Sequence, residues 1–89
     1  MDSCNHFVYI LECSDGTFYT GYTNDLQNRL KSHNSGKGAK YTRIRTPCKI
    51  VYYEIFSDKS SAMKREYQIK HNLTRKDKET LIRSNPYHG

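Results

Sequence analysis

Two tyrosines, Tyr9 and Tyr19, lie in two short segments that are rich in aromatic and β-branched residues. Asp15-Gly16 separates the segments, and an Asp-Gly pair in this position predicts a β-hairpin that sets the two phenols on neighbouring strands. Gly21 follows in the second segment, where a missing side chain lets a backbone or a ligand approach closely. Three polar residues further along the chain could complete a site that cleaves a phosphodiester: Arg29, His33 and Glu66.

Arg29 and His33 are expected on one face of a helix, because residues four apart are neighbours there. Arg29 lies at the border of the apolar stripe formed by Leu26 and Leu30, where a guanidinium can present its planar fork to a phosphate. An ordinary surface arginine and a structural histidine are the alternatives. For either residue taken alone, the alternative is the commoner outcome.

Glu66 is an acidic residue at an apolar position of a later helix. Its spacing from Ala62 and Ile69 turns it toward the apolar face, where an unpaired carboxylate would cost several kcal/mol. A divalent cation or an arginine would remove that cost, and a single carboxylate suits Mg²⁺ or Mn²⁺ held with waters and substrate phosphate. The spacing leaves an ion pair with Lys70 or Arg65 equally open.

The elements that must position these residues are a hairpin, one further strand and three helices. The patterns predict a hairpin over 7–22, a helix capped by Asn24 or Asp25 and ended by Gly36 and Gly38, and a buried strand over 48–56. A helix over 57–71 and a last helix to residue 84, opened by a capping box at 74–77, complete the chain before a frayed tail at 85–89. The order β-β-α-β-α-α predicts an α+β fold with a small three-stranded, mostly antiparallel sheet flanked by helices.

The charge balance of the chain is strongly basic. Its 89 residues include 15 Lys and Arg against 9 Asp and Glu, which gives a formal net charge of +6. This length predicts one domain over 1–89, with about 6–84 as its ordered part and room for one modest core. The charge favours a polyanion such as DNA as partner, and the predicted contact residues lie in a basic stretch: Lys37, Lys40, Tyr41, Arg43 and Arg45. A solvated loop is the alternative for this stretch.

The three cysteines are widely spaced at Cys4, Cys13 and Cys48. They form neither a disulfide framework nor a Cys-x-x-Cys metal pair. No segment resembles a signal peptide, and no apolar run approaches the length of a membrane span. We therefore expect a soluble cytoplasmic protein with reduced thiols.

Taken together, these motifs resemble the GIY-YIG nucleases. Val8-Tyr9-Ile10 corresponds to the first motif and Tyr19-Thr20-Gly21 to the second, with Arg29 and His33 at the expected places and Glu66 in Lys64-Arg65-Glu66-Tyr67. The likeness covers nearly the whole chain and is closest to the small stand-alone bacterial GIY-YIG proteins. Their typical basic segment is similar to residues 36–42 of this chain.

The resemblance implies a metal-dependent DNA endonuclease, structure-dependent or weakly specific, in DNA repair or recombination. In such an enzyme Tyr19 would activate or position the water, and Tyr9 would support it. Arg29 would hold the phosphate, and His33 would assist proton transfer or bind a neighbouring phosphate. Glu66 would anchor one Mg²⁺ or Mn²⁺. The sequence does not decide which phenol acts as the base.

Four departures from the family pattern leave a second function open. Phe7 and Thr20 replace the glycine and isoleucine of the motif name, Tyr22 stands where some repair members carry a lysine that helps to ionise a phenol, and the late asparagine has no clear counterpart. The alternative is a nucleic-acid-binding module with the nuclease fold and little activity of its own. No separate targeting domain is evident, so a protein partner could supply targeting.

Overall fold

The structure is a computed structural model, and it describes residues 5–34 and 46–84. Its elements follow in the predicted order: β1 (His6–Glu12), β2 (Phe18–Thr23), α1 (Leu26–Asn34), β3 (Lys49–Phe56), α3 (Lys59–Asn72) and α4 (Arg75–Ser84). The three strands form one antiparallel sheet in the order β2-β1-β3. The predicted α+β class is confirmed. The predicted end of α1 at Gly36 and Gly38 and the predicted tail lie outside the described residues.

The hairpin between β1 and β2 sets the register of the two tyrosines. Gly16 has a φ of 85° in the connecting turn, a conformation that glycine adopts without a steric penalty. Asp15 accepts hydrogen bonds from the backbone N–H and the hydroxyl of Thr17, at 3.1 and 2.6 Å. In the resulting register Tyr9 lies opposite Gly21, and Leu11 lies opposite Tyr19.

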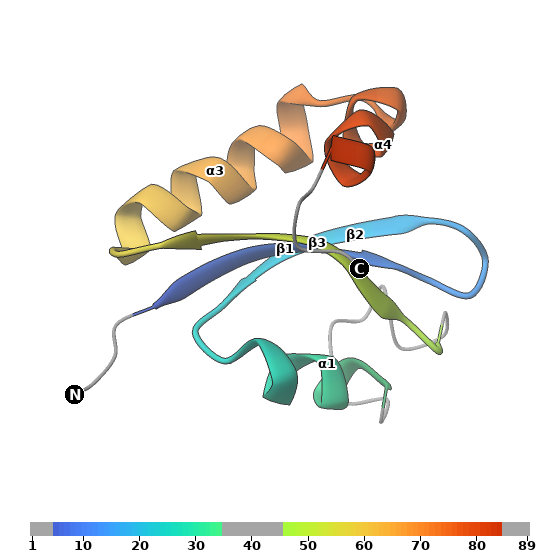
Figure 1. The fold of residues 1–89 in the computed structure, drawn as a ribbon, viewed down its shortest axis with the longest axis horizontal. Helices are drawn as coiled ribbons and strands as arrows, with labels where there is room; N and C mark the ends of the chain where they lie inside the picture. The colour runs from blue at the N-terminus through green and yellow to red at the C-terminus, as the bar shows by residue number, and fades with distance from the viewer. Residues whose placement is uncertain (1–4, 35–45, 85–89) are drawn as a thin grey trace.

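Helices cover both faces of the sheet, with α1 on one side and α3 and α4 on the other (Figure 1). Because side chains alternate along the central strand β1, Val8 and Ile10 pack toward α3, whereas Tyr9 and Leu11 pack toward α1. All four side chains are at most 1% exposed. The expectation of a single core is therefore wrong, since the sheet divides the apolar interior into two clusters.

Side chains at the helix starts satisfy the first backbone N–H groups, as the sequence predicts. Of the two candidate caps for α1, it is Asp25 whose carboxylate accepts from the backbone N–H of Asn28, at 3.2 Å. The capping box before α4 is complete: Thr74 accepts from the N–H of Asp77 at 3.2 Å, and Asp77 accepts from the N–H of Thr74 at 3.1 Å. The helix expected over 57–71 begins two residues later, because Asp58 serves as its cap.

An ion pair between the sheet and α3 accounts for Arg65. Its guanidinium donates to both carboxylate oxygens of Glu54 on β3, the shortest contacts being 2.9 Å. Glu54 also accepts from the hydroxyl of Tyr52. Burial and this neighbouring carboxylate raise the pKa of Tyr52 to about 12. Arg65 is thus held by Glu54, and Glu66 must find another partner.

Two of the cysteines meet where β1 ends and β3 begins. The thiols of Cys13 and Cys48 are buried, and the Cys48 thiol donates to the Cys13 sulfur at 3.4 Å. Burial raises the pKa of the Cys48 thiol to about 12. Within residues 5–34 and 46–84, no helix has both the length and the apolar character that a membrane crossing requires.

Candidate active site

Tyr9 lies at the centre of the site, with its ring over the backbone of β2. A Cβ atom at Gly21 would lie 2.5 Å from the Tyr9 phenol oxygen and 2.7 Å from Cζ. The close approach predicted at this glycine is therefore made by the phenol of Tyr9 itself. Because only glycine leaves this space, Gly21 determines where the Tyr9 hydroxyl can sit.

Gly21→Ala is expected to destabilise the protein by about 1–3 kcal/mol, because the new methyl group must displace the buried Tyr9 ring. Urea unfolding measures this loss. Gly16→Ala is the control, because its Cβ would have no atom within 4 Å, although its φ of 85° costs some strain. A smaller loss at Gly21 than at Gly16 would contradict the close packing of Tyr9.

A chain of hydrogen bonds connects the partly buried Arg29 with the buried Tyr9 and His33. The Tyr9 hydroxyl lies 3.0 Å from His33 Nε2, and Arg29 Nε donates to the Tyr9 oxygen at 3.4 Å. Burial, with a smaller effect from the Arg29 charge, lowers the pKa of His33, so its ring is neutral at pH 7 and its Nε2 can accept a hydrogen bond from the Tyr9 hydroxyl. Burial also raises the pKa of Tyr9, which outweighs the opposing hydrogen bond from Arg29. Tyr9 is therefore a neutral phenol that aligns its two neighbours.

The lowered pKa of His33 predicts that acid destabilises the fold. The unfolded chain takes up this proton near its ordinary pKa of about 6.5, whereas the folded protein does so only at lower pH. The free energy of unfolding should therefore fall as pH decreases below about 6.5 and level off below the folded pKa. Urea unfolding across this range should show a weaker decline in His33→Gln. The exposed His71 offers His71→Gln as a control, and an equal decline in both variants would contradict the assignment.

Tyr19 is the more accessible of the two phenols. It is partly buried, whereas Tyr9 is 1% exposed. Its ring centroid lies 5.4 Å from that of His33 and 6.4 Å from that of Tyr9. A hydrogen bond to Tyr9, together with the neighbouring phenol of Tyr19, raises the pKa of the Arg29 guanidinium. Tyr19 is thus the phenol that a solvent water or a substrate can reach.

Glu66 reaches this cluster from α3, the helix on the opposite face of the sheet. β2 is an edge strand, so side chains of α3 can extend past it. The Glu66 side chain is 15% exposed, and its charge contributes to the raised pKa of Tyr9. Lys70 Nζ lies 3.2 Å from its Oε2. Glu66 is therefore largely buried, as its spacing predicts, and it also forms the ion pair with Lys70 that the sequence left open.

Lys70 belongs to the site, although the sequence analysis considered it only as an ion-pair partner of Glu66. Its Nζ lies 5.8 Å from the ring centroid of Tyr19 as well as against Glu66. The i,i+4 spacing to Glu66 was a visible signal for the ion pair. The contact with Tyr19 had no sequence signal, because it depends on how α3 packs against β2.

Glu66 is the carboxylate of this cluster that suits a metal ion. The described ranges 5–34 and 46–84 contain no group of three or more His, Cys, Asp or Glu side chains that could form a closed metal site. Mg²⁺ usually keeps several waters and binds one or two carboxylates together with substrate phosphates. A single, largely buried carboxylate fits that mode of binding. The predicted DNA contacts, Lys37, Lys40, Tyr41, Arg43 and Arg45, lie outside the described residues.

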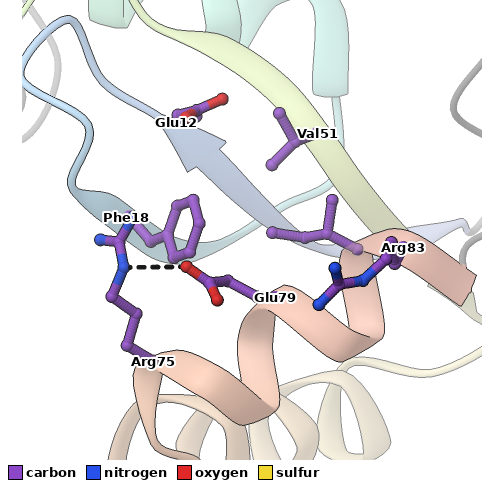
Figure 2. Close-up of a pocket in the computed structure, with 7 residues that line it drawn as sticks. Glu12, Phe18, Val51, Arg75, Glu79 and Arg83 are labelled. Atoms are coloured by element: carbon purple, nitrogen blue, oxygen red, sulfur yellow. Dashed lines mark hydrogen bonds and ion pairs between the residues drawn. The ribbon is translucent and has the colours of Figure 1, made fainter.

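A separate cavity of about 410 Å³ lies between α4 and the other face of the sheet (Figure 2). The Arg75 guanidinium stacks 4.4 Å from the ring centroid of Phe18, and its Nε pairs with Glu79 at 3.1 Å. Phe18 belongs to the cluster packed toward α3 and α4, whereas Tyr19 belongs to the cluster packed toward α1. This cavity is therefore not part of the tyrosine site.

Comparison with known proteins agrees with the fold. The family of GIY-YIG catalytic domains matches residues 5–79. This chain belongs to the GIY-YIG family. Among relatives of this GIY-YIG domain, the UPF0213 protein YazA of Bacillus subtilis is 52% identical over 92% of this chain and 82% of its own length. A UPF0213 protein of Halobacterium salinarum is 59% identical over 86% of this chain and 99% of its own.

Two solved structures share the GIY-YIG fold described here. The solution structure of a UPF0213 protein from Bacillus halodurans is 54% identical, covers 93% of this chain and 89% of its own, and superposes with a TM-score of 0.59. That of a protein from E. faecalis is 44% identical, with coverage of 94% and 90% and a TM-score of 0.62. The predicted resemblance, to GIY-YIG domains and in particular to their small relatives, is confirmed.

Proposed function

We propose that this protein is a metal-dependent DNA endonuclease that hydrolyses phosphodiester bonds. The proposal rests on the observation that β1, β2, α1 and α3 together bring five polar residues into one cluster. These residues are Tyr9, Tyr19, Arg29, His33 and Glu66. A phenol, a guanidinium and a carboxylate supply the functions that phosphodiester hydrolysis requires.

Each side chain has a role that follows from its exposure. Tyr19, which is partly exposed, orients the attacking water and, in its phenolate form, takes the proton of that water. Arg29 stabilises the charge that builds up on the phosphate, held in position by its contact with Tyr9. His33 is fully buried, so it aligns Tyr9 and does not bind a second phosphate. A Mg²⁺ or Mn²⁺ ion held by Glu66 would supply charge neutralisation at the departing 3′ oxygen.

The proposed substrate follows from the net charge and from the small size of this domain. A net charge of +6 favours nucleic acid, and the basic stretch at 37–45 stays the predicted contact region. This small domain offers little surface for reading a long sequence, so we propose structure-dependent or weakly specific cleavage, in DNA repair or recombination. A protein partner would then supply targeting.

One observation favours the second candidate, a nucleic-acid-binding module with little activity. Lys70 already pairs with Glu66 at 3.2 Å, so the carboxylate has a cationic partner without a metal. A binding module could retain such an ion pair. It would not require the hydrogen-bonded arrangement of Arg29, Tyr9 and His33, and we therefore place the nuclease first.

The test is cleavage of a labelled panel of single-stranded, duplex, flapped and branched DNA in Mg²⁺, Mn²⁺ or EDTA. We expect cleavage of at least one branched or flapped substrate with either metal and none in EDTA. Binding without cleavage of any substrate would establish the second candidate. Cleavage that persists in EDTA would rule out the proposed metal.

Lys70→Met is expected to tighten Mn²⁺ binding about 2- to 10-fold, because Lys70 competes with the metal for Glu66. Titration calorimetry on the free protein measures this affinity without any substrate. Lys64→Met removes the same charge from an exposed position of the same helix and should change the affinity less. Equal affinities in the two variants would show that Lys70 and the metal do not share Glu66.

A further inference from the structure

A groove of about 620 Å³ lies beside α1, where Leu26, Gln27 and Leu30 line it. Its apolar surface comes from both the sheet and the helix, chiefly Phe7, Leu30, Ile50 and Tyr53, and the amides of Asn24 and Gln27 line its rim. β3 is an edge strand of the sheet, and α1 leaves this part of its face uncovered. The groove is therefore part of the same sheet face as the tyrosine site.

The groove lies one strand away from Tyr9. Tyr53 on β3 is the register partner of Tyr9 on β1, and the two strands are about 4.8 Å apart. Both side chains belong to the cluster that faces α1. The groove therefore opens on the sheet face that carries the tyrosine site, two strands away from Tyr19 on β2.

The chemistry of the groove suits a flat, mainly apolar ring with a polar edge. Phe7 and Tyr53 form an edge-to-face pair, with ring centroids 6.1 Å apart and planes at 64°. Side-chain amides offer both donors and acceptors, which match the edge of a nucleobase. The Asp25 carboxylate also lines the groove and disfavours a phosphate there. The groove is therefore better suited to a nucleobase than to the charged sugar-phosphate backbone.

We propose that this groove holds an unpaired nucleobase of the bound DNA, on the sheet face that carries the tyrosine site. The base packs against Tyr53 and Phe7 and forms a hydrogen bond with the side-chain amide of Gln27. This inference rests on the proposed function and specifies its substrate: because bases inside a duplex have no free faces, the groove selects DNA with a bulged, flapped or single-stranded nucleotide.

The test compares two DNA duplexes that each contain one bulged nucleotide, either a thymidine or an abasic residue. Binding is measured by fluorescence anisotropy in EDTA, so that metal-dependent cleavage does not interfere. Wild type should bind the thymine bulge about tenfold more tightly than the abasic bulge, as expected for one stacked base. Tyr53→Leu and Gln27→Ala should both reduce this ratio toward one.

Tyr67→Leu is the matched control, because Tyr67 is 62% exposed on α3 and stacks on His71 away from the groove. It should retain the wild-type ratio. Gln27 is exposed, so Gln27→Ala decides the matter if Tyr53→Leu does not fold. A binding ratio of one in wild type would overturn the inference. An unchanged ratio in Gln27→Ala and in a folded Tyr53→Leu would overturn it as well.

The outcomes also separate this inference from the proposed function. Cleavage of the DNA panel by wild type together with a binding ratio of one would overturn the base groove alone. Failure of wild type to bind either bulged duplex, with no cleavage of the panel, would overturn both.

Discussion

Glu66→Gln is expected to lower metal-dependent cleavage by a factor on the order of 10³ or more, since a metal ion contributes several kcal/mol of charge stabilisation in the transition state. Glutamine keeps the size of the side chain and removes its negative charge. DNA affinity should stay the same or rise, because an anion near the phosphate site is lost. Initial rates in Mg²⁺ and binding in EDTA measure the two effects separately.

The control for this variant is Glu79→Gln on α4. Glu79 forms an i,i+4 ion pair with Arg75 at 3.1 Å, just as Glu66 does with Lys70, and it lines the cavity on the other side of the sheet (Figure 2). Loss of this pair should leave cleavage within about twofold of wild type, because a surface ion pair contributes little. Loss of DNA affinity with unchanged cleavage in Glu66→Gln would contradict the proposed metal ligand.

Tyr19→Phe is expected to lower turnover by about 10²- to 10⁴-fold, the range for a group that transfers a proton in the transition state. The fold should be retained, because the Tyr19 ring is only partly buried and phenylalanine keeps its packing. Single-turnover cleavage at saturating enzyme measures the chemical step and excludes an effect on binding.

Tyr22→Phe provides the comparison, since it removes a hydroxyl from the same strand on the opposite face of the sheet. The Tyr22 hydroxyl lies 2.7 Å from His6 Nδ1, so its loss removes a hydrogen bond without touching the site. We expect turnover close to wild type. If Tyr19→Phe were as active as Tyr22→Phe, Tyr19 would have no part in proton transfer.

Features that depend on neighbouring residues could be predicted from the sequence. The Asp15-Gly16 turn, the alternation along β1 and the capping box at Thr74 and Asp77 each involve residues within a few positions of one another. Local steric preferences and hydrogen bonds decide such features, so the element order and the α+β class followed from them. The joint spacing of the tyrosines with Arg29, His33 and Glu66 also indicated the family, which the comparisons confirm.

Contacts between distant elements were decided by the tertiary structure alone. The space above Gly21 is filled by Tyr9, Arg65 pairs with Glu54, and Lys70 lies beside Tyr19. Helices pack on both faces of the sheet, so the core is divided in two. On the face of α1, the groove beside Tyr53 is left open by that helix. Periodicity shows which face of a helix is apolar, but the partner of that face depends on how all the layers pack together. For this reason the sequence indicated the candidate side chains of the site, whereas packing determined which are buried, which are accessible and which cation accompanies Glu66.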